Sequence, residues 1–474
     1  MNALVSYDDS DSEDTLVKEE PFSESLLECE TAKQRLVSNL TGPNSEFPNY
    51  RDKKEPHTTA SNLYIQFAST AWRPNKPTPQ CIQEAVCPSL QPVVSSAAMN
   101  AKRSSPAGLK PYMSKRQRLS TLAVSSEVNK EGLSELQATR SRLLSEVSER
   151  VRPFLGRKGG RTELPRSVQH HIQAHQGPVN TVQWCPVPHL SHLLLSASMD
   201  KTFKVWDGAT SGQCLQTYST HCGAVRDACW MPCGRRLFSG SFDNTAAITD
   251  VETGQVIAKM ENQFMVTCLA IQPSDPSVVL CGGFSAEVKA WDSRTCKVIK
   301  VYRAGIQQTL DILFLGEGKE LVTSSDAVSR DSADRTLIAW DFVTTAKISN
   351  QIFHERYTCP SLALHPQEDC FVAQTNGNYI ALFSTQKPYK MNKRKRFEGH
   401  KVEGYAVQCE LSPDGTMLVS GSSMGSVHFY DFQRTRSLSI LHAHQQACLG
   451  VSFHPVLPAV FATCDWGGEI KIWN

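Results

Sequence analysis

The sequence lacks the features that mark a membrane or secreted protein. None of its apolar runs reaches the roughly 18–20 residues that a helix needs to cross a bilayer. Its first thirty residues hold ten acidic side chains against one base, Lys18, where a secretory signal carries bases and then an apolar stretch. We therefore expect a soluble protein that is not secreted and does not contact a membrane.

The chain also has little net charge and no sign of a disulfide framework. Against 47 Asp and Glu residues stand 49 Lys and Arg residues, which leaves a formal charge of +2, so a charged partner must meet a local cluster. The 16 cysteines include no C-x-x-C pair, and we interpret them as reduced thiols that pack as small apolar side chains. This usage is typical of a cytosolic or nuclear protein.

Common catalytic and nucleotide-binding motifs are missing as well. The sequence contains no P-loop, no dinucleotide-binding glycine turn, no nucleophile elbow and no H-E-x-x-H motif. The glycine cluster at 156–160 does not have the spacing of a phosphate-binding loop. We therefore predict a non-enzymatic protein without a cofactor or a bound metal.

The first 165 residues differ in composition from the rest. Ser, Pro, Asn, Gln and Glu dominate and apolar residues come in short islands, which predicts a mostly disordered region. Apolar residues at three- and four-residue steps over 131–152 predict one amphipathic helix, which docks either on the downstream domain or on a partner. Two basic clusters, eleven residues apart, resemble a bipartite nuclear import signal: Lys102 and Arg103, then Lys115, Arg116 and Arg118.

From about residue 166 the chain repeats itself. Each unit closes with an aromatic residue, or a substitute for it, followed by a polar residue. The steps between the second members of these pairs are 43, 42, 49, 43, 47 and 43 residues. That period predicts one four-stranded unit per repeat. The seven pairs are Trp206-Asp207, Thr249-Asp250, Trp291-Asp292, Trp340-Asp341, Phe383-Ser384, Tyr430-Asp431 and Trp473-Asn474.

Polar residues recur at fixed places inside the units. A histidine opens most of them, an acid occupies the turn between two strands, and a tryptophan follows. Together with a Ser or Thr these side chains can form a buried hydrogen-bonded set, for which we predict a structural role. The predicted members are His175, Asp200, Trp206, His221, Asp243, Asp334, Trp340, His400 and His444.

The seventh unit needs a strand from elsewhere. Its closing pair ends the third strand, so the fourth strand of its sheet must be supplied by another segment. We predict that the segment just before His175 pairs beside residues 469–473 and closes a ring, which also covers two sheet edges. In this pairing Val168 and Ile172 meet the strand that contains Ile470 and Trp473.

The period of the repeat and the polar residues that recur inside each unit together resemble the WD-repeat family. The resemblance covers residues 166–474 and implies an all-β fold, a seven-bladed WD-repeat propeller, after the disordered region 1–165. The strings 397–406 and 411–415 are similar to the sixth unit of the WD-repeat pre-mRNA-processing factors, and 444–473 is similar to their last unit. This implies a monomeric, nuclear interaction scaffold in a multi-protein complex of spliceosomal type.

A basic cluster between units five and six leaves two interpretations open. Five bases lie within seven residues and could contact the phosphates of RNA. The same cluster is equally consistent with a solvated loop or a second import signal. Its members are Lys390, Lys393, Arg394, Lys395 and Arg396.

An alternative function is that of a substrate adaptor of a cullin ubiquitin ligase. The pair Trp291-Asp292 is followed by Arg294, which resembles the box by which some WD-repeat proteins bind the linker subunit of that ligase. For either function, Arg226 is a further candidate partner contact, because it lies near the start of a first strand and arginine is common in interaction hot spots.

Overall fold

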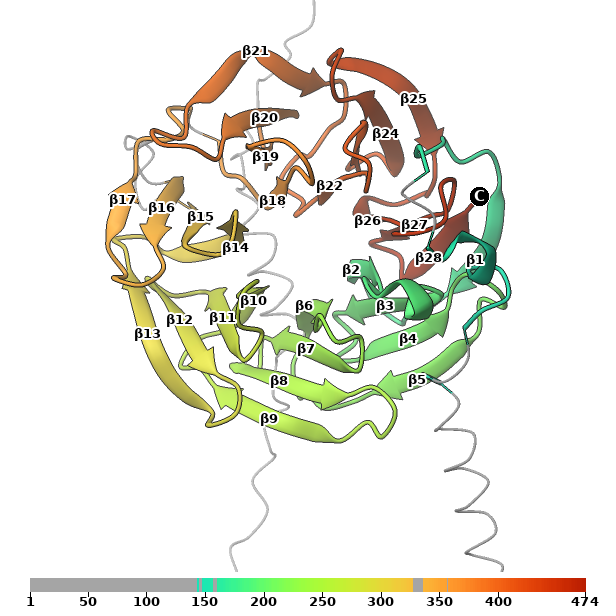
Figure 1. Cartoon of the computed structure of the whole chain (residues 1–474), viewed down its shortest axis with the longest axis horizontal. Coiled ribbons are helices and arrows are strands. Elements are labelled where there is room, and N and C mark those ends of the chain that lie inside the picture. Colours follow the sequence, from blue (N-terminus) through green and yellow to red (C-terminus); the bar gives the residue numbers. More distant parts are fainter. Residues whose placement is uncertain (1–142, 145–146, 157–159, 327–335, 356) are drawn as a thin grey trace, which may run out of the picture. The chain divides into compact units, whose positions relative to one another are not determined.

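The fold is a closed ring of seven sheets. A computed structural model describes residues 143–144, 147–156, 160–326, 336–355 and 357–474 of the 474-residue chain. Each of the seven sheets has four antiparallel strands, and the sheets stand side by side around a common axis (Figure 1). The predicted seven-bladed propeller is therefore confirmed. No helix in these ranges has the length and apolar content of a membrane span.

The first four blades follow one another in chain order. Blade one contains β2 (Val179–Trp184), β3 (Leu193–Ser198), β4 (Phe203–Asp207) and β5 (Cys214–Tyr218). Blade two contains β6 (Val225–Trp230), β7 (Arg236–Ser241), β8 (Thr245–Asp250) and β9 (Val256–Glu261). Blade three contains β10 (Val266–Ile271), β11 (Val278–Gly283), β12 (Glu287–Asp292) and β13 (Lys297–Arg303). Blade four contains β14 (Gln308–Leu315), β15 (Glu320–Asp326), β16 (Leu337–Asp341) and β17 (Lys347–Ser349).

The remaining three blades complete the ring. Blade five contains β18 (Ser361–Leu364), β19 (Cys370–Thr375), β20 (Tyr379–Ser384) and β21 (Met391–Glu398). Blade six contains β22 (Cys409–Leu411), β23 (Met417–Ser420), β24 (Ser426–Asp431) and β25 (Arg436–His442). Blade seven contains β26 (Cys448–Phe453), β27 (Phe461–Asp465), β28 (Glu469–Trp473) and β1 (Val168–Gln173). Two short 3-10 turns, η1 (Arg152–Phe154) and η2 (Pro188–Leu190), complete the described elements.

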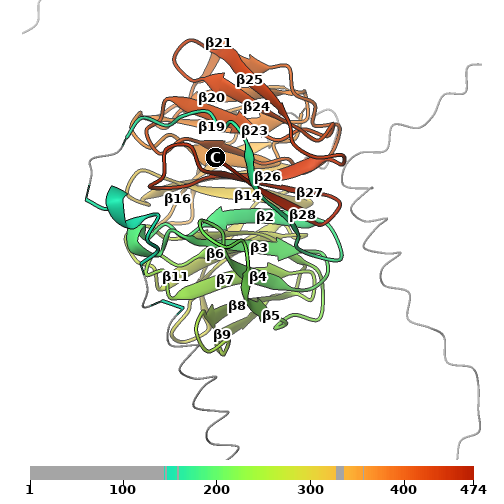
Figure 2. The same ribbon diagram turned by 90° about the vertical axis from the view of Figure 1, so that its right-hand side faces the viewer.

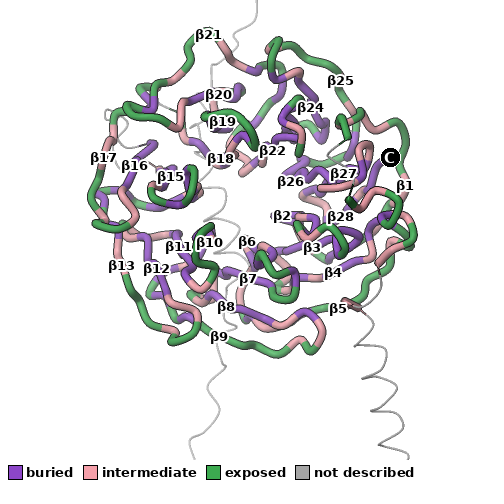
Figure 3. The backbone as a smooth tube through the Cα atoms, viewed as in Figure 1, coloured by how far each residue is buried: buried purple, intermediate pink, exposed green. Residues whose placement is uncertain are grey.

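Burial changes from the axis to the rim of each blade. All residues of the second strands β3, β11 and β19 are buried, because both faces of these strands pack between neighbouring blades. Outer strands such as β9 and β13 are exposed over much of their length. The burial map in Figure 3 shows the same arrangement, with buried backbone inside and exposed backbone at the rim. The core is thus a set of apolar layers between blades rather than one central cluster.

Strand β1 closes the ring. It pairs antiparallel with β28, so that Val168 lies opposite Trp473 and Ile172 opposite Ile470. Ile172 packs against the apolar layer shared by blades seven and one, whereas the side chain of Val168 is 45% exposed. Backbone pairing and the packing of Ile172 therefore join the start of the ring to its end.

The segment before β1 lies on one side of the disc. We call this side the back face; it carries the connections from inner to second strands and from third to outer strands. Arg150 donates from Nη1 to the carbonyl oxygen of Ala209 in blade one, at 2.8 Å. The Thr162 amide donates to Oδ2 of Asp414 in blade six, at 2.7 Å. The blue-green segment along one side of the edge-on disc in Figure 2 is this strap, residues 147–156 and 160–166.

The strap bears on two predictions about the N-terminal region, although residues 131–142 and 145–146 lie outside the described residues. The helix predicted over 131–152 is absent from its described part, where turns lead into η1. The side chain of Val151 is fully buried against blades seven and one, so tertiary packing and Pro153 override the helical spacing. Because the strap is packed on the ring, order begins before the predicted boundary at residue 165. Residues 1–142, which include Lys102 and the other predicted import residues, lie outside the described residues.

Removing β1 should open the ring. A chain without residues 1–174 loses the partner of β28 and the packing of Ile172, and the bare sheet edge favours aggregation. We expect it to precipitate or to melt at least about 10 °C below a chain that lacks only residues 1–142, by thermal unfolding followed with circular dichroism. Equal melting temperatures for the two truncated chains would contradict this role of β1.

Candidate functional site

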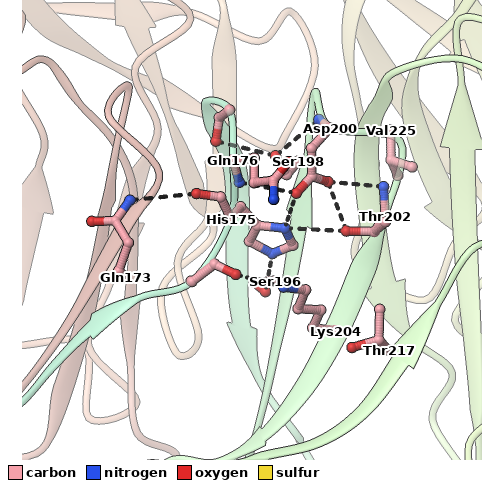
Figure 4. Close-up of polar contacts among 12 residues, drawn as sticks. Gln173, His175, Gln176, Ser196, Ser198, Asp200, Thr202, Lys204, Thr217 and Val225 are labelled. Atoms are coloured by element: carbon pink, nitrogen blue, oxygen red, sulfur yellow. Dashed lines mark hydrogen bonds and ion pairs between the residues drawn. The ribbon is translucent and has the colours of Figure 1, made fainter.

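Blade one contains a buried hydrogen-bonded set (Figure 4). The imidazole of His175 bonds through Nδ1 to Oδ2 of Asp200 at 2.9 Å and through Nε2 to the hydroxyl of Ser196 at 2.8 Å. The indole of Trp206 donates from Nε1 to the same hydroxyl at 2.9 Å. Four side chains from the entry segment, β3, the turn and β4 are thus linked in one chain of hydrogen bonds.

The electrostatics of this set suit a structural role. Burial lowers the pKa of His175 and outweighs the opposing effect of Asp200, so the imidazole stays neutral. Burial alone would raise the pKa of Asp200, but hydrogen bonds from His175 and Thr202 hold it well below its usual range. A neutral imidazole between a fixed carboxylate and a hydroxyl has both ring nitrogens occupied. The set has no free group for chemistry on a substrate.

Blade two keeps the histidine and the acid but not the indole. His221 bonds through Nδ1 to Asp243 at 3.0 Å and through Nε2 to the hydroxyl of Ser239 at 2.9 Å. Thr249 occupies the place of the tryptophan, and its buried hydroxyl has no hydrogen-bond partner. The set is therefore one member short in this blade.

Blades three and four keep only part of the set in the described residues. In blade three Asn262 accepts a hydrogen bond from the indole of Trp291 at 3.2 Å. In blade four Trp340 donates to Thr323 at 2.9 Å, and the predicted turn acid Asp334 lies outside the described residues.

Blade six pairs two aromatic side chains in place of the full set. His400 bonds through Nδ1 to the hydroxyl of Tyr430 at 2.9 Å, and burial lowers the pKa of His400 to about 3. The sequence predicted a Ser or Thr bonded to the tryptophan, which is the place of Thr323 in blade four, but it did not predict Asn262 and Tyr430 as partners.

Blade seven brings His444 close to two acids. Its Nε2 bonds to the hydroxyl of Thr463 at 2.8 Å, and Trp473 donates to the same hydroxyl at 3.0 Å. Its Nδ1 lies 3.6 Å from carboxylate oxygens of both Asp465 and Glu469, a grouping that resembles a metal-ligand set. The blade-one arrangement is not repeated here, because Nδ1 of His175 bonds to Asp200 at 2.9 Å, whereas Nδ1 of His444 forms no hydrogen bond with either acid.

The hydroxyl that joins histidine and tryptophan should be important for stability. Ser196→Ala leaves His175 and Trp206 without their shared partner, and we expect a loss of about 2 kcal/mol in the free energy of unfolding, measured by urea titration. Thr249→Val in blade two removes a hydroxyl without a partner and is the matched control, expected to be neutral or stabilising. Similar losses in both variants would contradict a structural set.

Acids on three inner strands link neighbouring blades. Each carboxylate accepts a hydrogen bond from a backbone N–H on the inner strand of the next blade. The bonds are Leu269 to Asp227 at 2.9 Å, Leu362 to Asp311 at 2.7 Å, and Phe453 to Glu410 at 2.9 Å. Desolvation raises the pKa of all three, to about 7 for Asp311 and about 8 for Glu410.

The raised pKa of Glu410 predicts a pH-dependent stability. A carboxyl whose folded pKa exceeds its unfolded value stabilises the fold fully below the unfolded value, and this contribution is lost as pH rises through the folded value. For Glu410 that window runs from its usual 4.5 to about 8. Glu410→Gln removes the titration, so its stability relative to the unmodified protein should rise by up to about 4 kcal/mol from pH 5 to pH 8.5. Parallel pH profiles from urea unfolding would contradict the assignment.

We call the side of the disc opposite the back face the front face. There, β-bulges direct side chains toward the axis of the ring. The inner strands β6, β10 and β14 each have a register shift near their start. The residue skipped by the pairing is Arg226 in β6, Thr267 in β10 and Leu310 in β14. A bulge commonly re-aims a side chain in this way. All three residues line one hollow.

Aromatic residues border this hollow. Phe242 and Phe284 directly follow β7 and β11 and meet edge to face, with ring centroids 6.1 Å apart. Tyr405 lies across the hollow and meets Trp466 edge to face at 5.4 Å. The hollow has a volume of about 570 Å³, including the open space at its mouth. We call it the axial hollow; it combines one arginine with half-buried apolar surface.

Only part of the axial hollow was predicted from the sequence. Arg226 was identified as a candidate contact, and it lines the hollow. Phe242 and Phe284 were missed, although a signal exists: each directly precedes the turn position that Asp243 occupies in blade two and Ser285 in blade three. In both blades a phenylalanine stands just before a polar turn residue, and its side chain lines the axial hollow. This repeated position is the signal that could have identified the two side chains.

The other predicted contacts lie elsewhere on the ring. Arg294 lies on the back face, where its guanidinium binds Asp292 through two hydrogen bonds of 3.0 and 3.1 Å. The basic cluster does not lie in a connection between blades, as the sequence suggested, because most of it forms the outer strand β21 of blade five. The structure therefore does not bring Arg226, Arg294 and the basic cluster together.

Comparison with known proteins identifies the repeat. The family model "WD domain, G-beta repeat" (WD40) matches residues 166–207, 212–250, 391–431 and 435–474. Each match begins with the outer strand of one blade and continues through the first three strands of the next, namely β1–β4, β5–β8, β21–β24 and β25–β28. The chain is therefore a WD40-repeat β-propeller protein, as the sequence predicted.

Among curated proteins, the chain is 61% identical to "WD repeat-containing protein 25" of Mus musculus over 328 residues, which cover 69% of this chain and 61% of that protein. It is 30% identical to "Pre-mRNA-processing factor 17" of Homo sapiens over 313 residues, or 66% of this chain and 52% of that protein. The factor of the same name from Saccharomyces cerevisiae is 26% identical over 282 residues, or 59% of this chain and 60% of that protein. The chain thus spans between half and two thirds of the length of these relatives.

Proposed function

We propose that the protein is a non-enzymatic, nuclear interaction scaffold that docks a partner of a pre-mRNA-processing complex at the axial hollow. The observation that carries this proposal is the convergence of Arg226 with Phe242, Phe284 and Tyr405 on one hollow of the front face. Arginine and aromatic side chains are the residues most often found in interaction hot spots. A rigid ring that presents them at its axis is suited to gripping another protein.

The relatives support the kind of complex. Two of the proteins most similar to this chain are named for pre-mRNA processing, and the matched region covers the ring. In the blades, the histidines are bonded to hydroxyls or acids in structural sets, which is consistent with a scaffold rather than an enzyme. Pre-mRNA processing takes place in the nucleus, and the basic clusters from Lys102 to Arg118 would direct the chain there.

Affinity capture with paired charge reversals tests the proposal. Arg226→Glu changes the axial hollow on the front face, whereas Arg294→Glu reverses one arginine on the back face and serves as the matched control. We expect spliceosomal proteins to be captured from nuclear extract by the unmodified protein and by Arg294→Glu, and at least about tenfold less by Arg226→Glu. Phe284→Ala should reduce capture in the same way, with melting temperatures compared to exclude unfolding.

The competing function gives the opposite result. If the chain is a cullin-ligase adaptor, the captured proteins are a ligase linker and a cullin, and Arg294→Glu rather than Arg226→Glu removes them. Capture of spliceosomal proteins that is equal for all three variants would reject the axial hollow as the docking site.

A further inference from the structure

The outer strand of blade five carries an exposed positive charge that the ring does not neutralise. The side chains of Lys390, Lys393 and Arg394 are exposed, and none of them forms an ion pair with an acid in the described parts of the chain. Arg396, further along β21, is bound to Glu355 and belongs to the fold. The unneutralised charge therefore lies on these three exposed bases and on half-buried Lys395, whose Nζ lies 5.4 Å from the ring centroid of Phe432.

A bulge holds two of these bases away from the sheet. In the pairing of β20 with β21, Ala381 lies opposite Arg396 and Phe383 lies opposite Met391, so one residue of β20 faces four residues of β21. Oδ1 of Asn392 accepts hydrogen bonds from the backbone N–H groups of Arg394 at 3.1 Å and of the next residue at 3.3 Å. The backbone here is thus folded into a fixed protrusion that displays Lys393 and Arg394 at the rim.

An exposed aromatic ring lies beyond the other end of the same strand. Tyr357 is 44% exposed and meets Tyr379 edge to face, with ring centroids 6.2 Å apart. Tyr379 is itself fixed, because the guanidinium of Arg396 lies 4.6 Å from its ring centroid and its hydroxyl bonds to Glu355. Tyr357 is therefore held in place by its neighbour while part of its ring remains open to solvent.

The aromatic residues nearest to the bases in the chain are not available for stacking. Tyr389 and Phe397 flank the bases in the chain, but both are fully buried and cannot stack on a ligand. Tyr357, more than thirty residues earlier, is brought to the end of the basic strand by its contact with Tyr379, which lies opposite Glu398 of β21. Only the fold reveals this combination.

We propose that the rim of blade five, formed by Lys390, Lys393, Arg394 and Tyr357, binds single-stranded RNA. Proteins that bind single strands combine a line of bases, which tracks the phosphates, with aromatic rings on which bases stack. The four residue-to-residue steps from Arg394 to Glu398 span about 13 Å, so the protrusion and the ring can contact successive nucleotides of one RNA strand. An acidic protein could also bind the three bases, but its carboxylates would not require an aromatic ring beside them. Tyr357 therefore favours RNA as the ligand. This site is separate from the axial hollow, and either proposal can fail alone.

RNA binding by the full chain tests the site. Fluorescence anisotropy with a labelled uridine 12-mer is measured over a series of salt concentrations for the unmodified protein and for a variant with Lys390, Lys393 and Arg394 changed to alanine. We expect about a tenfold loss of affinity and a salt dependence reduced by about two charges, because fewer counterions are released. Tyr357→Ala should lower affinity about tenfold and leave the salt dependence unchanged, since stacking is not ionic.

A matched control distinguishes binding at this site from non-specific attraction of RNA to positive charge anywhere on the protein. It removes three exposed lysines from the outer strands β9, β13 and β17, namely Lys259, Lys297 and Lys347, and is expected to retain affinity. A second control changes the five bases from Lys102 to Arg118 to alanine, so that any contribution of that region is measured by itself. Unchanged binding in the blade-five variant, an equal loss in the lysine control, or tighter binding of a polyglutamate peptide than of RNA would overturn the proposal.

Discussion

The pairing of β1 with β28 is the constraint on which the rest of the structure depends. A propeller blade buries apolar surface only against its neighbours, so each apolar layer needs a blade on both sides. If the ring is open, the layer that contains Trp184, Ile470 and Val151 loses one wall and two sheet edges face water. The strap reinforces the same junction, because its backbone and side-chain bonds reach blades one, six and seven from a single stretch of chain. Closure is thus secured by main-chain pairing, by packing and by the strap together.

Within the closed ring, neighbouring blades are joined by hydrogen bonds between their inner strands. These hydrogen bonds do not involve residues on the outer surface. Side-chain oxygens on four inner strands each accept a hydrogen bond from a backbone N–H of the inner strand in the next blade. They belong to Gln183, Asp227, Asp311 and Glu410. Because this network and the apolar layers hold the frame, turns and outer strands are free to vary. The two proposed contact surfaces use this freedom: the axial hollow is built from bulges and turns, and the rim of blade five from an outer strand.

The number of blades and the closing strand could be predicted because they follow from local spacing. Seven closing pairs at nearly constant intervals define seven sheets, and a sheet with a missing strand requires the segment before His175. The functional surfaces could not be predicted in the same way, because they depend on which side chains face one another across the fold. Phe242 meets Phe284 from a different blade, and Tyr357 reaches β21 only through Tyr379. Likewise, the spacing over 131–152 indicates a helix in isolation, but burial of Val151 on the ring favours a turn.

The closing strand also sets the order in which this protein can fold during synthesis. Ser167 and Asn474, which meet beside the closing pair of strands, are 307 residues apart in the chain. Blades one to six can form as they leave the ribosome, but β1 emerges before them and has no strand to pair with until β28 follows. While the residues between β1 and β28 are made, it remains an unpaired edge next to half-covered apolar surface, a state prone to association between nascent chains. Molecular chaperones that shield such edges are therefore expected to matter more for producing this protein than for maintaining it once the ring has closed.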